Sequence, residues 1–332
     1  MRLERKVWML VGAVVLCIIG SVQLAGVSPS EALKVLWNGN FGSATSINDL
    51  LKEVTPLLLL GMSVYLALRA GLFNIGAEGQ YLVGAVTGAA ICLKIPGLIG
   101  MVAGMVGGAV AGSLWALPAG WIRAYRNGHE VITKIMMNNI ALQVTAVLVA
   151  GVLKDPSQQG TTTRLLAESS RLGTVTIGAV AISWSVVIGI VAIVLGANWL
   201  SKYVGGYELR AVGENPIAAT FAGIQAPRTQ LVAMLVSGAI AGLAGALQVL
   251  AYECRFFKDF SPGYGFDALG VALLAGGSML GVIPAAVGFA ILNNGRTSLS
   301  ILGVPKGITS VILGLMIVVV ASVRYKKVAT HE

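Results

Sequence analysis

The sequence predicts an all-α membrane protein with about ten transmembrane or partly spanning helices, some of them broken. Hydrophobic residues make up 56% of the 332 residues and charged residues only 11%, whereas a soluble domain carries about 25% charged residues. The apolar residues form long continuous runs, which disfavours a β-barrel with its alternating pattern. The 43 glycines indicate close helix packing and interrupted helices.

Ten apolar spans can be marked along the chain. The first, 7–24, follows the basic segment 1–6 and lacks a clear cleavage site, so we interpret it as a retained anchor rather than a signal peptide. Spans 79–93, 265–280 and 283–294 are shorter than the ~20 residues of a full crossing, and we expect broken or partial helices there. The remaining spans are 54–70, 97–118, 139–153, 176–197, 229–250 and 307–323.

Basic residues flank the first and last spans: Arg2, Arg5 and Lys6, and then Arg324, Lys326 and Lys327. Basic flanks favour the cytoplasmic side, and an even number of crossings returns the chain to its starting side. Both termini are therefore predicted to be cytoplasmic, with 25–53, 154–175 and 251–264 outside and 119–138 and 198–228 inside. No Ser/Pro-rich linker divides the chain, so residues 1–332 are expected to form one membrane domain.

Small residues recur at every fourth position in the span 97–118 and just beyond it. This spacing lets a neighbouring backbone approach one helix face closely, and Gly238/Gly242 and Ala241/Gly245 repeat it. We interpret both rows as scaffold packing without a role in substrate recognition. The longer row consists of Gly100, Gly104, Gly108, Gly112, Ala116 and Gly120.

The segment 71–80, Gly-Leu-Phe-Asn-Ile-Gly-Ala-Glu-Gly-Gln, places polar residues between two apolar stretches. Its glycines interrupt helical structure, which is tolerated at membrane depth only inside protein or beside a water-filled cavity. Asn74, Glu78 and Gln80 are therefore predicted to lie along a solute pathway or to hold the broken backbone together. A solvated cytoplasmic turn is the alternative. The segment 266–277 weakly repeats this polar, glycine-bearing entry into a short apolar span.

The internal segment 206–224 predicts a short amphipathic helix. The dipeptide Asn215-Pro216 is typical of a helix start, and Gly223 can end the helix. Such a helix suits insertion into a groove of a partner protein; a helix on the lipid surface fits less well, because this one is short and rich in alanine. Its apolar face would be formed by Ile217, Phe221 and Ile224.

Polar residues near the other spans each have a structural and a functional interpretation. Asp267 can cap a helix N-terminus or contact a solute, while Tyr264 and Phe266 can line an entrance or belong to the interfacial aromatic belt. His129 and Glu130 are expected in a solvated turn. Amides can join helices or recognise an uncharged solute; those near apolar spans are Asn138, Asn139, Gln143, Gln248, Asn293 and Asn294.

The composition argues against several other classes. The net charge of +9 comes from basic residues scattered over loops and termini, which indicates topology rather than nucleic-acid binding. Cys17, Cys92 and Cys254 and the two histidines have no metal or redox spacing. The sequence contains no Ser/His/Asp set, zinc motif or phosphate loop. We therefore expect neither catalysis nor a cofactor bound by this chain itself.

The segments 71–80, 210–224 and 263–277 together resemble the inner-membrane permeases of ATP-binding-cassette (ABC) importers for nucleosides and simple sugars, a family that includes ribose-type and branched-chain amino-acid permeases. The resemblance covers the chain from about the second span to its end. Residues 74–80 are most similar to the nucleoside-uptake branch, whose permeases pair as different subunits. The resemblance implies a type II-like importer permease fold.

The resemblance also implies a mechanism. An external binding protein delivers solute to two permeases, and two cytoplasmic ATPases, which bind ATP and Mg²⁺, act through the short helix in the coupling loop 198–228. The family's inner polar motif matches Asn74, Gly76, Glu78 and Gly79, and its coupling segment matches Arg210, Ala211, Gly213, Asn215, Ala218, Ala219 and Gly223. Glu214, Pro216, Ile217 and Phe221 complete the coupling candidates.

The residues themselves leave open the substrate pathway, the class of solute and two other functions. A permease for a simple sugar such as ribose is the main alternative. A secondary transporter with Glu78 or Asp267 as proton carrier would need neither an ATPase nor the short helix, and an intramembrane enzyme lacks a catalytic set. The pathway candidates are Asn74, Glu78, Gln80, Asn139, Gln143, Gln248, Phe266, Asp267 and Asn293.

Overall fold

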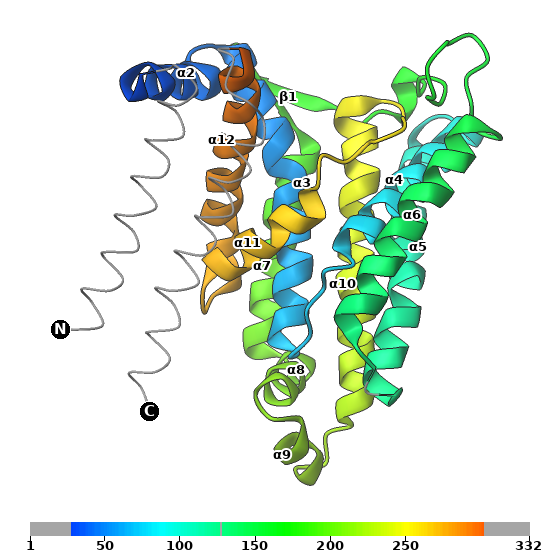
Figure 1. Cartoon of the computed structure of the whole chain (residues 1–332), viewed down its shortest axis with the longest axis vertical. Coiled ribbons are helices and arrows are strands. Elements are labelled where there is room, and N and C mark those ends of the chain that lie inside the picture. Colours follow the sequence, from blue (N-terminus) through cyan, green and yellow to red (C-terminus); the bar gives the residue numbers. More distant parts are fainter. Residues whose placement is uncertain (1–27, 127, 302–332) are drawn as a thin grey trace.

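The computed structural model describes residues 28–126 and 128–301 and shows a helical bundle (Figure 1). Within these residues, five helices are long and apolar enough to cross a membrane. They are α3 (Ala44–Arg69), α5 (Leu98–Arg126), α6 (Glu130–Ala150), α7 (Trp184–Lys202), and α10 (Ala226–Gln248) with its π-helical continuation η2 (Val249–Glu253). The predicted class of an all-α polytopic membrane protein is confirmed. The predicted spans 7–24 and 307–323 and both chain ends lie outside the described residues.

Helix α3 is the centre of the bundle. In its most apolar stretch 83% of the residues are buried, against 22% in α5 and in α6. It packs against α7 and α10, and against α11 (Tyr264–Ala275) and α12 (Val282–Ile301). The outward faces of α5, α6 and α7 carry exposed aliphatic side chains, which a membrane protein covers with lipid.

Two short helices begin inside the bundle rather than at its surface (Figure 1). After α3 the chain turns back into the bundle as an irregular segment, residues 70–76, before α4 (Ala77–Lys94) begins. Helix α11 follows a loop that enters from the opposite end, and the chain then turns back through η3 (Met279–Gly281) into α12. The expectation of partial helices at 79–93 and 265–280 is therefore confirmed.

The glycine row of α5 lies where α4 and α10 cross it. A Cβ atom on Gly108 would lie 2.6 Å from Cβ of Ala246 and 2.9 Å from the carbonyl oxygen of Gly84. A Cβ atom on Gly242 would collide with the carbonyl oxygen of Gly108. These backbones can touch only because the side chains are absent, so the rows are the scaffold packing predicted from the sequence.

One end of the bundle carries α2 (Pro29–Phe41) and a cap of paired loops (Figure 1). Strands β1 (Thr174–Ile177) and β2 (Val180–Ser183) form an antiparallel hairpin with Thr174 opposite Ser183. The segment 161–172, which includes η1 (Glu168–Ser170), pairs through its backbone with 250–258. For example, the N–H of Leu166 donates to the carbonyl of Cys254 at 2.8 Å. We call the paired segments 161–172 and 250–258 the loop cap.

Several predicted boundaries were wrong. Helix α6 begins at Glu130 rather than at 139, because its first polar residues point into the bundle and find partners there. Helix α7 begins at Trp184 rather than at 176, because 174–183 forms the β-hairpin. Helix α12 has 20 residues and exceeds the predicted 283–294. The predicted loop 25–53 contains α2 and the start of α3.

Candidate functional site

The carboxylate of Glu78 joins the two helices that begin inside the bundle. Glu78 lies in the first turn of α4 and is only 8% exposed, and its Oε2 accepts a hydrogen bond from the N–H of Gly265 at 2.7 Å. Gly265 lies in the first turn of α11. Helix starts have unpaired N–H groups and a partial positive charge, which both favour a carboxylate. A side chain at Gly265 would collide with the backbone of Glu78, so this approach requires glycine.

Asn74 and Gln80 bind each other through reciprocal amide hydrogen bonds. Asn74 Nδ2 donates to Gln80 Oε1 at 2.8 Å, and Gln80 Nε2 donates to Asn74 Oδ1 at 3.1 Å. Asn74 also donates to Oγ of Ser237 on α10 at 2.8 Å, and Ser237 is hydrogen-bonded to Ser63 on α3. All four residues are buried. The interpretation of this segment as a solvated turn is therefore wrong, and the pair holds the broken backbone against α3 and α10.

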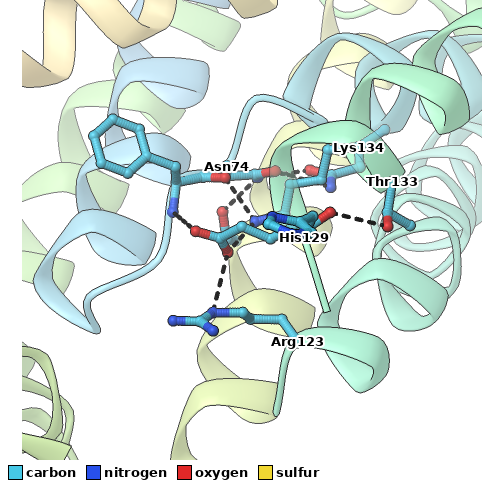
Figure 2. Close-up of polar contacts among 9 residues, drawn as sticks. Asn74, Arg123, His129, Thr133 and Lys134 are labelled. Carbon is cyan, nitrogen blue, oxygen red and sulfur yellow. Dashed lines mark hydrogen bonds and ion pairs between the residues drawn. The ribbon is translucent and has the colours of Figure 1, made fainter. Parts of the chain in front are cut away.

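Glu130 and Lys134, one turn apart on α6, hold the backbone of Phe73 in the irregular segment. Glu130 Oε1 accepts from the N–H of Phe73 at 3.3 Å, and Lys134 Nζ donates to its carbonyl at 2.6 Å. The two side chains pair with each other at 2.9 Å, and that of Lys134 is 1% exposed. Arg123 lies near the end of α5, and its Nε is 3.9 Å from Glu130 Oε2 (Figure 2). Glu130 was wrongly expected in a solvated turn, because its carboxylate has these partners inside the bundle.

Asn138, one further turn along α6, holds the next part of the same backbone. It donates to the carbonyl of Ile75 at 2.9 Å and accepts from the N–H of Gly79 at 2.9 Å. We call Glu130, Lys134 and Asn138 the α6 stripe. These residues satisfy backbone groups that the glycines remove from helical pairing. The spacing by fours was visible in the sequence, but it lay in a segment interpreted as a loop.

Asp267 and Asn293 are brought together by α11 and α12. Asn293 Nδ2 donates to Asp267 Oδ2 at 2.8 Å, and Asn293 is largely buried. Asp267 therefore joins two helices in addition to lying in the first turn of α11. Gln248 is buried at the end of α10, and Phe266 is about half exposed. Contact of these residues with a solute stays a prediction.

Asn139 and Gln143 lie on the opposite face of α6 from the α6 stripe. Both are exposed, and they stand one turn apart in the middle of a membrane-spanning helix. Asn139 donates to the carbonyl of Ile135 at 3.0 Å within its own helix. An amide pair is costly against lipid, so this face is suited to a water-filled path or a neighbouring subunit.

The predicted coupling loop folds into α8 (Val204–Glu214) and α9 (Pro216–Phe221), at the end of the bundle opposite the loop cap (Figure 1). The predicted cap is confirmed: Asn215 Oδ1 accepts from the N–H groups of Ile217 and Ala218, each at 3.0 Å. Gly223 follows the helix with a φ of +87°, as expected of a helix-ending glycine.

The exposed apolar face of α9 is narrower than predicted. Ile217 is 69% exposed and Phe221 is 89% exposed. Ile224, expected on the same face, instead packs against a small cluster of Val212, Ala219 and Ala226. This cluster ties α9 to α8 and to the start of α10. Of the other coupling candidates, Arg210 and Gly213 are half-buried on α8, while Glu214, Pro216 and Ala218 are exposed.

Comparison with known proteins agrees with this architecture. Residues 46–321 match the family described as branched-chain amino acid transport system / permease component. The guanosine ABC transporter permease protein NupP of Bacillus subtilis (strain 168) is 36% identical over 307 residues, which cover 90% of this chain and 87% of that protein. The glucose ABC transporter permease protein TsgB13 of Haloferax volcanii is 30% identical over 329 residues, covering 93% and 87%.

Two further relatives carry nucleoside names. The nucleoside ABC transporter permease protein NupB of Lactococcus lactis subsp. cremoris is 32% identical over 311 residues, covering 89% of this chain and 84% of that protein. A second guanosine permease protein of the same Bacillus strain, NupQ, is 26% identical over 256 residues, covering 75% and 79%. No solved structure matches the chain.

The chain belongs to this family of transport-system permease components. Membership confirms the resemblance to ABC importer permeases found in the sequence, and it makes the chain a multi-pass membrane permease. It also favours that function over the secondary transporter and the intramembrane enzyme.

Proposed function

We propose that this chain is one of two permease subunits of an ABC importer that moves nucleosides across the cell membrane. The observation that carries the proposal is α9, a capped helix that exposes Ile217 and Phe221 at one end of the bundle. Large apolar side chains exposed on a short protruding helix favour a protein partner. The nucleoside and guanosine names of NupP and NupB support this choice of solute.

The partner at α9 is proposed to be a cytoplasmic ATPase that binds ATP and Mg²⁺ and supplies the hydrolysis. An open groove of about 730 Å³ separates α9 from the end of α5. Ile217 and Phe221 line one side, and Arg123 and Arg126 line the other. In this orientation the α8–α9 end is cytoplasmic and the loop cap faces outward, where a substrate-binding protein would dock. Cytoplasmic termini stay a prediction.

The solute path is proposed to run along the exposed face of α6, beside a second, homologous permease. Asn139 and Gln143 would offer hydrogen bonds to an uncharged solute without binding a charge. The relatives support two different subunits, because the same Bacillus strain has both NupP and NupQ as guanosine permease proteins.

The test is labelled guanosine or uridine uptake by proteoliposomes that contain both permeases, the ATPase and the binding protein. ATP-dependent uptake that other nucleosides inhibit, and that ribose and glucose do not, is the expected result. The relative TsgB13 makes a sugar the second candidate solute. ATP-dependent uptake of sugar alone would therefore change the solute and keep the architecture, whereas uptake driven by a proton gradient without the ATPase would overturn the proposal.

A further inference from the structure

We propose that the irregular segment 70–76 is the joint that carries movement of α9 to the helix starts at Glu78, with Gly213 and the α6 stripe as its positioning contacts. This inference rests on the proposed coupling role of α9 and names the residues through which that coupling would enter the bundle. Three contacts carry it, and they follow one another along the chain from the α9 end to the middle of the bundle.

The first contact joins α8 directly to the end of α3. A Cβ atom on Gly213, two residues before the cap of α9, would collide with the carbonyl oxygen of Arg69 and would lie 3.0 Å from the nitrogen of Gly71. In the other direction, a Cβ atom on Gly71 would lie 3.3 Å from Cα of Gly213. Backbone therefore touches backbone, and Gly71 has a φ of +74° that favours glycine. Close-packed contacts of this kind transmit displacement because they are barely compressible.

Helices α8 and α9 are built to move together. The cluster of Val212, Ala219 and Ala226 joins α9 to α8 and to the first residue of α10, and the N–H of Asn215 donates to the carbonyl of Ala211 at 3.0 Å. A partner that pushes on Ile217 and Phe221 therefore also displaces Gly213. Displacement of Gly213 would in turn displace Gly71, the second residue of the irregular segment.

The second contact is the α6 stripe, which holds the middle of the segment. Glu130 and Lys134 fix both backbone polar groups of Phe73, and Asn138 fixes Ile75 and Gly79. Irregular backbone can absorb changes in φ and ψ that a helix resists. Held at these points and displaced at Gly71, the segment would turn about α6 rather than slide freely.

The third contact is the hydrogen bond between the first turns of α4 and α11, which movement of the segment would displace. Helix α4 begins at Ala77, immediately after the segment, and Glu78 bonds to the start of α11. Rotation of the segment therefore displaces the hydrogen bond between Glu78 and Gly265, the point at which the two broken helices meet. The structure thus links the docking helix to the middle of the bundle without a long side-chain relay.

The first experiment compares Gly213→Ala with wild type in the complete reconstituted importer, measuring nucleoside uptake and ATP hydrolysis in the same vesicles. A methyl group at Gly213 forces the backbones apart, so uptake per ATP hydrolysed should fall by about tenfold or more. The matched control is Gly288→Ala on α12, where an added Cβ meets no atom of the described residues within 4 Å, and uptake per ATP should not change. A Gly213→Ala importer with the wild-type ratio would overturn the inference.

The second experiment exchanges Glu130 and Lys134 in the double variant Glu130→Lys/Lys134→Glu. The exchange keeps an ion pair on α6 but presents each charge to the backbone group of Phe73 that it repels. Uptake per ATP hydrolysed by the double variant should therefore fall below the wild-type ratio. A wild-type ratio would instead show that an ion pair on α6 is sufficient and would contradict the inference. The control is Thr133→Val, next to Lys134; among the described residues, the Thr133 hydroxyl bonds to the carbonyl of His129, the N-cap residue of α6.

A third measurement does not depend on a disruptive variant. Phe73 is 46% exposed, so Phe73→Cys, in a chain with Cys17, Cys92 and Cys254 replaced by serine, reports movement of the segment by its rate of thiol labelling. ATP binding by the complete importer should change this rate by about threefold or more if the segment moves. An unchanged rate in an importer that transports would refute the joint. Absence of ATP-dependent uptake by wild type would instead refute the proposed function.

Discussion

Replacing the carboxylate of Glu78 by an amide tests whether charge at the meeting of α4 and α11 serves transport. The variant Glu78→Gln keeps an oxygen acceptor of the same reach for the N–H of Gly265, now at 2.7 Å from a carboxylate oxygen. A hydrogen bond to a charged group contributes about 1.5–3 kcal/mol, and one between neutral groups about 0.5–1.5 kcal/mol. The loss is therefore about 1–1.5 kcal/mol, or about five- to tenfold in the equilibrium between joined and separated helix starts.

The fold itself should tolerate this change. Glu78 is 8% exposed, so its charge carries a desolvation cost. Removing the charge removes this cost, which offsets part of the lost hydrogen-bond energy. We expect a melting temperature within about 4 °C of wild type and a rate of ATP-driven uptake about five- to tenfold lower. Purified yield, melting temperature and uptake are measured on the same preparations.

Two companions separate charge from structure. Glu78→Leu removes the acceptor and leaves the N–H of Gly265 without this partner, so it should lower the melting temperature as well as uptake. Glu31→Gln, at an exposed carboxylate in the first turn of α2 and outside the loop cap, is the matched control and should behave as wild type. Wild-type uptake by Glu78→Gln would refute the reasoning, and collapse of its folded yield would show that the charge is needed for folding.

Other predictions concern the coupling helix, the scaffold and the path. Ile217→Asp with Phe221→Asp should abolish ATP-driven uptake while membrane insertion stays normal, because charge replaces the apolar docking face; unchanged uptake would exclude α9 as the docking element. Asn215→Ala removes the α9 cap at a cost of about 1 kcal/mol and should weaken ATPase binding in pull-down assays, whereas Asn215→Ser should restore it. Gly242→Leu should prevent folding, seen as loss of monodisperse protein in detergent, because its side chain would enter the backbone of α5. Asn139→Leu with Gln143→Leu should reduce uptake but not ATPase binding; normal uptake would move the solute path elsewhere.

The sequence was sufficient for the helical class, the glycine packing and the capped short helix α9, because each depends on local pattern. Asn215-Pro216 and Gly223 predict the start and the end of a short helix whatever its tertiary surroundings. Glycines at every fourth position indicate that another helix crosses at close range. The boundary of α6 was not predictable in the same way. Lys134 looks like a residue for the aqueous side until its partners, Glu130 and Phe73, are known to lie beside it.

The roles of the polar residues depend on contacts between distant segments. Glu78 could be assigned to a pathway or to the backbone from the sequence, and only the meeting of α4 with α11 identifies Gly265 as its partner. Asn74 and Gln80 are six residues apart, a separation that does not predict facing side chains on a regular helix. They meet because the irregular segment turns the chain back on itself.

The loop cap means that the chain need not be continuous to assemble. Residues 156–160 form an exposed tip, and a break there would separate the part that contains α2 to α6 from the part that begins with the segment 161–172. The two parts share the packing of α3 and α5 on α10. The backbone pairing of 161–172 with 250–258 lies wholly within the second part, so it would keep the cut end ordered while the helices hold the halves together. Fragments 1–157 and 158–332, produced in the same cell, should therefore recombine into a working permease, and a protease nick at this tip should leave transport intact.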